Sequence, residues 1–122
     1  MIQSRSCDGK KPIEWRGSSL ADLKNDHIFT IDARREAGHQ LSQVQAGLEP
    51  DRWKPFDEVG TGTKEIIINL DDGWFRVMYV AKFPEAVYVL HCFKKKTNTT
   101  SRQDKEIASV RYKAVVNMRT QQ

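Results

Sequence analysis

The chain has no long hydrophobic run, and this absence excludes a membrane-spanning helix. No stretch of its 122 residues approaches the roughly 18 consecutive apolar residues that such a helix needs. The first residues, MIQSRSCDGK, also lack the apolar region of a secretory signal. We therefore expect a cytoplasmic protein that has no membrane partner.

Cysteine is scarce, with two residues in the whole chain. Cys7 lies in a polar segment and Cys92 lies in a hydrophobic run, so the two have neither the spacing of metal ligands nor that of a disulfide framework. Free thiols in a reducing compartment are the expected state. The sequence predicts no zinc site.

Internal repeats and low-complexity segments are absent too. A length of 122 residues, with 39% hydrophobic and 30% charged residues, suits one ordinary globular domain. A formal charge of +4 and an isoelectric point near 9.2 suit a partner that is rich in phosphate or acidic side chains. We expect a single domain over residues 1–122, with a flexible tail at 1–11.

Residues 64–97 have the pattern of three antiparallel strands. Hydrophobic and aromatic residues dominate the runs 64–70, 74–81 and 86–95, and turn residues separate these runs. A two-residue turn at Asp72-Gly73 would place Asn69 opposite Arg76. If the second loop has an even number of residues, Arg76 lies opposite His91; an odd loop would separate them.

This register divides the side chains of the three strands between two faces. One face is almost wholly apolar and should be covered by helices: Ile66, Ile68, Leu70, Phe75, Val77, Tyr79, Tyr88, Leu90 and Cys92. The other face mixes polar with hydrophobic side chains: Glu65, Asn69, Arg76, His91 and Lys95 with Ile67, Trp74, Met78, Val80, Val87, Val89 and Phe93. We expect the chemistry of the protein on this second face.

The rest of the chain predicts one short strand and three helices, and hence an α+β fold. Residues 12–16 suit an edge strand that begins at a proline. Helices are expected at 20–26, 30–46 and 102–119, with Ser19 and Ser101 in capping boxes at the first and last. Residues 48–63 contain two prolines and two glycines and predict a long loop.

Several segments, taken in order, resemble the phage-derived, HigB-like branch of the RelE/HigB toxin superfamily. They are PIEWRGSSLADL, QVQAG, WKPF, GWFRVMYVAKF, YVLHCFKKKT and the closing D-x-E-I-A-x-x-R-Y, spread over roughly residues 13–113. The resemblance implies the RelE-like fold, in which an N-terminal helical hairpin packs on a small antiparallel sheet and a C-terminal helix follows. This agrees with the order of elements predicted above.

Members of this superfamily are toxins of type II toxin–antitoxin pairs, and the RelE-like and HigB-like ones cut mRNA in the ribosomal A site. The resemblance implies that an RNA 2′-hydroxyl attacks its own 3′-phosphate, without a metal or another cofactor. It also implies a helix-turn-helix antitoxin, the ribosome and mRNA as partners, and operator DNA reached only through the antitoxin. A second function stays open, because the related ParE toxins share the fold but bind DNA gyrase.

By the same resemblance, Arg76 is the phosphate clamp, since a guanidinium can hold two phosphate oxygens. Lys95 would bind phosphate or transfer a proton, and as an acid it needs a lowered pKa. His91 is either a proton carrier or a structural histidine. Expected RNA contacts are Lys54, Lys64, Lys94, Lys96 and Arg111, with bracing of the face as the alternative role of the arginine.

The chain departs from the family pattern at one position of the second face. The pattern has Glu-Ile-Arg where this chain has Glu65, Ile66 and Ile67. The missing arginine would share a face with Arg76, so one phosphate contact is expected to be absent. Arg76 and the last strand favour the nuclease, whereas Ile67 favours the non-nucleolytic alternative.

Overall fold

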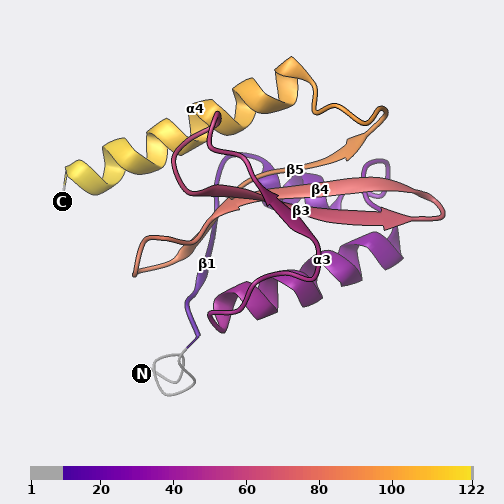
Figure 1. Ribbon diagram of the computed structural model, residues 1–122, viewed down its shortest axis with the longest axis horizontal. Helices are drawn as coiled ribbons and strands as arrows, with labels where there is room; N and C mark the ends of the chain where they lie inside the picture. The colour runs from indigo at the N-terminus through magenta and orange to yellow at the C-terminus, as the bar shows by residue number, and fades with distance from the viewer. Residues whose placement is uncertain (1–9, 122) are drawn as a thin grey trace.

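The computed structural model describes residues 10–121 and shows one sheet with helices on both of its faces (Figure 1). The elements are β1 (Ile13–Trp15), α2 (Ser19–Lys24), α3 (Ile31–Gln45), β2 (Trp53–Pro55), β3 (Thr63–Leu70), β4 (Gly73–Val80), β5 (Val87–Lys95) and α4 (Arg102–Thr120). The predicted α+β class is confirmed, and the arrangement is compatible with the RelE-like fold. Residues 1–9 of the predicted tail lie outside the described residues. None of the described helices is long and apolar enough to span a bilayer.

The predicted meander forms the centre of a five-stranded sheet with the order β1-β5-β4-β3-β2. β3, β4 and β5 pair antiparallel, and β1 joins β5 in parallel. β2 pairs antiparallel with β3 and lies inside the segment that was predicted to be a loop. Three residues that include a proline carry too little pattern to predict a strand, although proline is tolerated at an edge.

The turn between β3 and β4 lies one residue earlier than predicted, which shifts the pairing of the two strands by two residues. Leu70 pairs with Gly73, so the turn residues are Asp71 and Asp72, and Arg76 lies opposite Ile67. Gly73 is the first residue of β4 and not a turn residue. It leaves room for the neighbouring strand, because a Cβ there would lie 2.6 Å from the Cε of Lys94. A shift of two residues leaves every side chain on its predicted face.

β4 and β5 pair around a bulge that the sequence did not reveal. Met78 lies opposite His91 and Tyr79 lies opposite Val89, so Leu90 is an extra residue on β5. Residues 81–87 separate the paired Val80 and Tyr88, so the second loop has an odd number of residues and the pairing of Arg76 with His91 that an even loop predicted does not form: with the bulge, Arg76 faces Phe93.

The bulge also exchanges the faces of the β5 residues that precede it. Val87 and Val89 join the cluster under α3, whereas Tyr88 and Leu90 join the cluster under α4, the reverse of the prediction. All of these residues are apolar or aromatic, so no pattern in the sequence marks the change of face. Arg76, His91 and Lys95 lie beyond the bulge and still share a face, as predicted.

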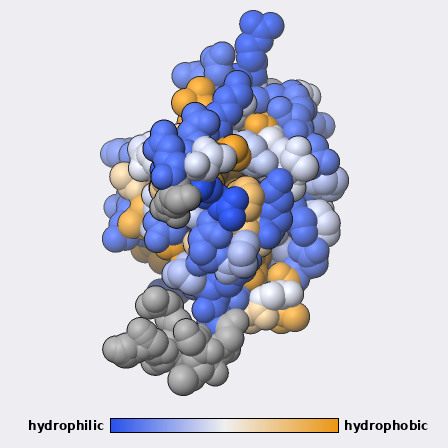
Figure 2. Space-filling view, turned by 90° about the vertical axis from the view of Figure 1, so that its left-hand side faces the viewer, coloured by the Kyte–Doolittle hydropathy of each residue, from blue (hydrophilic) through white to orange (hydrophobic). Residues whose placement is uncertain are grey.

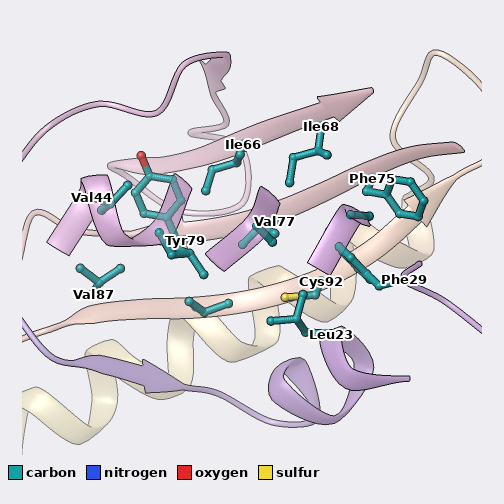
Figure 3. Close-up of a cluster of buried hydrophobic side chains, with 14 residues drawn as sticks. Leu23, Phe29, Val44, Ile66, Ile68, Phe75, Val77, Tyr79, Val87 and Cys92 are labelled. Atoms are coloured by element: carbon teal, nitrogen blue, oxygen red, sulfur yellow. The ribbon is translucent and has the colours of Figure 1, made fainter. Parts of the chain in front are cut away.

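Each face of the sheet has its own hydrophobic core. Under α3, the core contains Phe29, Ala33, Leu41, Val44, Ile66, Ile68, Phe75, Val77, Tyr79 and Cys92 (Figure 3). Under α4, it contains Met78, Val80, Leu90, Phe93, Ala108 and Val115. Burial of such side chains stabilises the fold by about 1.5–3 kcal/mol each, so the two helices are held firmly on opposite faces.

The start of α4 agrees with the prediction, but the start of α2 does not. Ser101 caps α4, since its Oγ accepts a hydrogen bond from the backbone N–H of Asp104 at 3.1 Å. Ser19 is the first residue of α2 instead of its cap, and its Oγ donates to the Val89 carbonyl. The cap of α4 is the more important, because it places Asp104 over the end of β5.

One side of the molecule is seen directly in Figure 2, which looks at the left of Figure 1. Among the described residues on that side, the surface is mostly hydrophilic and hydrophobic residues occur in small groups. Small exposed groups of this kind are normal for a protein surface.

Gly17 supplies a test of how α4 is fixed to the rest of the fold. It has a φ of +55°, and a Cβ there would lie 2.3 Å from Arg111 Nε. Arg111 in turn donates to the Leu90 carbonyl at 3.0 Å and to Ser18 Oγ at 2.9 Å. We expect Gly17→Ala to lower the free energy of unfolding by about 1–3 kcal/mol, because a φ of +55° strains alanine and because the methyl group displaces this brace. Chemical denaturation measures the change.

Gly38 in α3 provides the matched control, because a Cβ there would meet nothing within 4 Å. Gly38→Ala should raise the free energy of unfolding by about 0.5–1 kcal/mol through helix propensity. A Gly17→Ala protein as stable as the parent would contradict the bracing role of Arg111.

Candidate functional site

Charged side chains gather on the α4 face of the sheet, towards the β3–β4 turn. We call this group the polar face: Lys54, Glu65, Asn69, Arg76, His91, Lys95 and Asp104. The strand pairing brings the strand residues of this group together. One row across the sheet joins Lys54, Glu65, Met78 and His91. On the same face, the next row towards the β3–β4 turn contains Arg76, and the row after that contains Asn69 and Lys95. Alternation along each strand then aims these side chains to the same side.

Glu65 lies at the centre of the polar face and is 0% exposed. Its Oε1 is 3.7 Å from Lys54 Nζ and 3.8 Å from Arg76 Nε, and its Oε2 accepts a hydrogen bond from Thr100 Oγ1 at 3.1 Å. A buried carboxylate is costly unless cations or hydrogen bonds compensate it. Glu65 therefore holds Lys54 and Arg76 beside each other.

Arg76 is buried but retains unused donors. Its Nη1 donates to Asn69 Oδ1 at 2.8 Å and to the Phe75 carbonyl at 2.9 Å. Its Nε is buried and makes no hydrogen bond with the described residues. Burial lowers the pKa of Arg76, the Glu65 carboxylate opposes this decrease, and the nearby Arg52 adds to it. The guanidinium is thus oriented by Asn69 and only partly neutralised by Glu65.

Lys95 is also buried, and its Nζ donates to the Asn98 carbonyl at 2.6 Å. Burial lowers the pKa of Lys95, and Arg76 and Lys54 lower it further, whereas Glu65 and Asp104 act in the opposite direction. A lysine with a lowered pKa gives up its proton more readily near neutral pH. Lys95 therefore has the lowered pKa that a general acid at this position needs.

His91 is held by a carboxylate and an aromatic ring. Its Nε2 lies 2.8 Å from Asp104 Oδ1, and its ring stacks on Phe93 with centroids 4.7 Å apart. In the neutral imidazole, this contact with a carboxylate places the proton on Nε2 and the lone pair on Nδ1. Nδ1 is buried and makes no hydrogen bond with the described residues.

Asp104 was not predicted as a site residue, although the capping box placed it in the first turn of α4. Burial raises the pKa of Asp104, but hydrogen bonds from His91 and Ser101 lower it more, so the net shift is downward. A carboxylate that stays ionised keeps His91 in one orientation. Its contact with β5 depends on how α4 lies over the sheet, which the sequence pattern does not specify.

Three open hollows border the polar face. One of about 380 Å³ is lined by Lys54, Phe56 and Thr100 among others. A second of about 320 Å³ is lined by Lys95 and Asp104, and a third of about 580 Å³ follows β5 past His91 and Phe93. A ligand larger than a single ion can therefore approach Lys54, His91 and Lys95 through these hollows, whereas Arg76 lines none of the three.

The predicted RNA contacts separate into one residue on the polar face and four residues elsewhere. Lys54 lies on it, 46% exposed at its side chain. Lys64 points to the other face, where it pairs with Glu49 at 2.9 Å. Lys94 and Lys96 are exposed at the end of β5, one position out of phase with Lys95. Arg111 occupies its guanidinium in the brace described above, the role given as its alternative.

Glu65 allows a test of the electrostatics. Because its carboxylate raises the pKa of Lys95, Glu65→Gln should move that pKa further below its usual value. The change should also lower the free energy of unfolding by about 1–3 kcal/mol, since Lys54 and Arg76 lose their shared anion. An NMR titration of labelled lysine side chains and chemical denaturation measure the two effects.

Glu58→Gln is the control, because Glu58 is 63% exposed at its side chain and its one ion pair with residues 10–121 is with Lys105, at 3.4 Å. It should leave the pKa of Lys95 and the stability nearly unchanged. If Glu65→Gln did the same, Glu65 would not be the anion that organises the polar face.

Comparison with known sequences places this face in a family. Residues 27–113 match the phage-derived Gp49-like protein family (DUF891). The match includes α3, all strands of the meander and most of α4, and therefore the whole polar face. No similar sequence is found among the curated proteins. Because the match covers most of the chain, the protein belongs to the phage-derived Gp49-like family, a family of the RelE/HigB-like toxin type.

Proposed function

We propose that this protein is the toxin of a type II toxin–antitoxin pair, in the HigB-like branch, and that it cleaves mRNA on the ribosome without a metal. The observation that carries the proposal is the meeting of Arg76 and Lys95, both buried, beside the Glu65 carboxylate on a face bordered by open hollows. The family supports the toxin class. The cytoplasm, where mRNA is translated, is the proposed place of action.

The reaction is attack of an RNA 2′-oxygen on the adjacent phosphorus, with breakage of the bond to the 5′-oxygen. The proton of the 2′-hydroxyl leaves to a base, and the departing 5′-oxygen gains a proton from an acid. The products carry a 2′,3′-cyclic phosphate and a 5′-hydroxyl. Negative charge grows on the non-bridging oxygens during attack, so a fixed cation beside them lowers the barrier.

Arg76 is assigned to those non-bridging oxygens. Its guanidinium is already oriented by Asn69 through Nη1, and its buried Nε faces Glu65, so Nη2 is the side left for a phosphate. A planar fork can bind two phosphate oxygens at once. Glu65 is fully buried and cannot reach RNA, so its part is to hold Arg76 in place and to limit the repulsion between neighbouring cations.

His91 and Lys95 are assigned to the two proton transfers. Phe93 lies opposite Arg76. His91 stands two positions before Phe93 and Lys95 stands two positions after it, so each is about 7 Å along β5 from Phe93. In-line attack needs its base and its acid on opposite sides of the phosphorus. We assign the 2′-hydroxyl proton to His91, whose unpaired Nδ1 is buried in the free protein and has to become accessible when RNA binds, and we assign protonation of the leaving oxygen to Lys95.

The proposed partners follow from the same function. A helix-turn-helix antitoxin would neutralise the toxin by covering the polar face or by blocking entry into the ribosome. Contact with operator DNA is assigned to the antitoxin, and no metal or other cofactor is invoked in the reaction.

A second candidate is a non-nucleolytic inhibitor that, like ParE toxins, binds DNA gyrase or another protein. Ile67 favours it, because this uncharged residue lies directly opposite Arg76 on the polar face. Growth arrest with DNA damage signalling and intact translation would support this candidate over the nuclease.

Arg76→Ala is the main test of the nuclease. We expect it to abolish toxicity in growing cells and to reduce the rate of mRNA cleavage by at least about 100-fold, as for other fixed donors to a transition state. Arg76→Lys keeps the charge but loses the fork and should have intermediate activity. Circular dichroism verifies the fold of both variants. An Arg76→Ala protein that is folded and as toxic as the parent would remove the assignment.

Lys95 and Lys96 form a matched pair, because they are adjacent and only Lys95 is buried on the polar face. Lys95→Ala should reduce cleavage by about 100–10,000-fold, the range of general acid catalysis, whereas Lys96→Ala should change it by less than about threefold, as expected of a peripheral contact. Primer extension on a translated mRNA measures both rates. Equal losses in the two variants would refute the role given to Lys95.

A further inference from the structure

The edge strand β2 places another cation beside Arg76. The N–H of Ile67 donates to the Arg52 carbonyl at 2.9 Å, which continues the ladder formed by Trp53 with Ile66 and Lys54 with Glu65. Arg52 therefore stands opposite Ile67. Arg52 directly precedes β2, and continuation of the strand's alternation by one residue puts its side chain on the same side as Lys54, which is the polar face.

Arg52 and Arg76 occupy one row across the sheet, because Ile67 lies between them and opposite both. Two strand spacings separate their Cα atoms by about 10 Å. Two further observations relate the side chains. Arg52 and Asn69 line the same hollow of about 210 Å³, which Glu36 and Gln40 of α3 also line, and Asn69 is bonded to Arg76 at 2.8 Å. The charge of Arg52 also contributes to the lowered pKa of Arg76.

Arg52 forms no ion pair with the described residues. It is exposed, and its side chain makes no hydrogen bond or ion pair with residues 10–121. The carboxylates of Glu36 and Asp51 line the same hollow, but each is hydrogen-bonded to neutral amides: Glu36 accepts from Gln40 at 2.6 Å, and Asp51 accepts from Gln40 at 2.9 Å and from Gln43 at 3.3 Å. Two arginines that repel each other across an uncharged isoleucine form a site suited to anions.

We propose that Arg52 binds a second phosphate of the RNA, next to the phosphate held by Arg76, so that the substrate strand crosses the sheet from β2 towards β5. The inference rests on the proposed nuclease function and adds a binding site to it. Ile67 carries no charge, so each arginine serves its own phosphate. Arg52 contributes binding of the substrate and takes no part in the bond-breaking step.

The test is the concentration dependence of cleavage on mRNA-programmed ribosomes. Arg52→Ala should raise the half-saturating substrate concentration by about tenfold, the effect of losing one charge-assisted contact, and should leave the maximal rate within about twofold. Arg76→Ala should instead lower the maximal rate. Arg52→Lys retains a cation and should recover most of the affinity.

Arg35→Ala is the matched control. Arg35 is an exposed arginine on α3, which covers the opposite face of the sheet, so the variant removes the same charge without touching the polar face. It should leave both kinetic parameters unchanged. Equal effects of Arg52→Ala and Arg35→Ala would overturn the second phosphate site.

Failure of the Arg52 site can be distinguished from failure of the nuclease proposal. If the parent protein cleaves and Arg52→Ala behaves like the parent, the Arg52 site is refuted and the nuclease stands. If the parent protein cleaves no mRNA on the ribosome, the nuclease is refuted and the Arg52 site falls with it.

Discussion

The buried carboxylate of Glu65 is the interaction on which the polar face depends. A sheet can bring Lys54, Arg76 and Lys95 together by alternation alone, but like charges placed close together and away from water destabilise one another. Glu65 offsets this by facing two of the cations, while Thr100 satisfies its second oxygen. The result is a set of cations that is ordered before any ligand binds, which is the condition for electrostatic stabilisation of a transition state.

Most of the fold could be predicted because its signals are local. Alternating side chains, turn residues and caps predicted the three central strands, the edge strand β1, the three helices and the membership of Arg76, His91 and Lys95 in one face. Errors of two residues in the register did no harm, since they preserve the faces. The bulge at Leu90 could not be predicted, because the β5 residues around it are apolar on both sides.

The candidate site was only partly predictable for a different reason. Which residues share a strand face follows from the sequence, but contacts between distant elements do not. The pairs Glu65–Thr100 and His91–Asp104 depend on how the loop after β5 and the start of α4 lie over the sheet. Arg52 was missed because β2, which begins at the next residue, is three residues long and lies in a segment that contains prolines. The uncharged position at Ile67 therefore has an arginine on each side of it.

The most direct measurement is the chemistry of the RNA ends that form when the protein is added to a purified translation reaction. Attack by a 2′-hydroxyl on this face predicts cuts inside codons that require ribosomes, with 2′,3′-cyclic phosphate and 5′-hydroxyl ends. A 2′-deoxynucleotide at the cut position should then block cleavage. Fragments with 5′-phosphate ends, or intact mRNA with normal translation, would contradict the proposed nuclease.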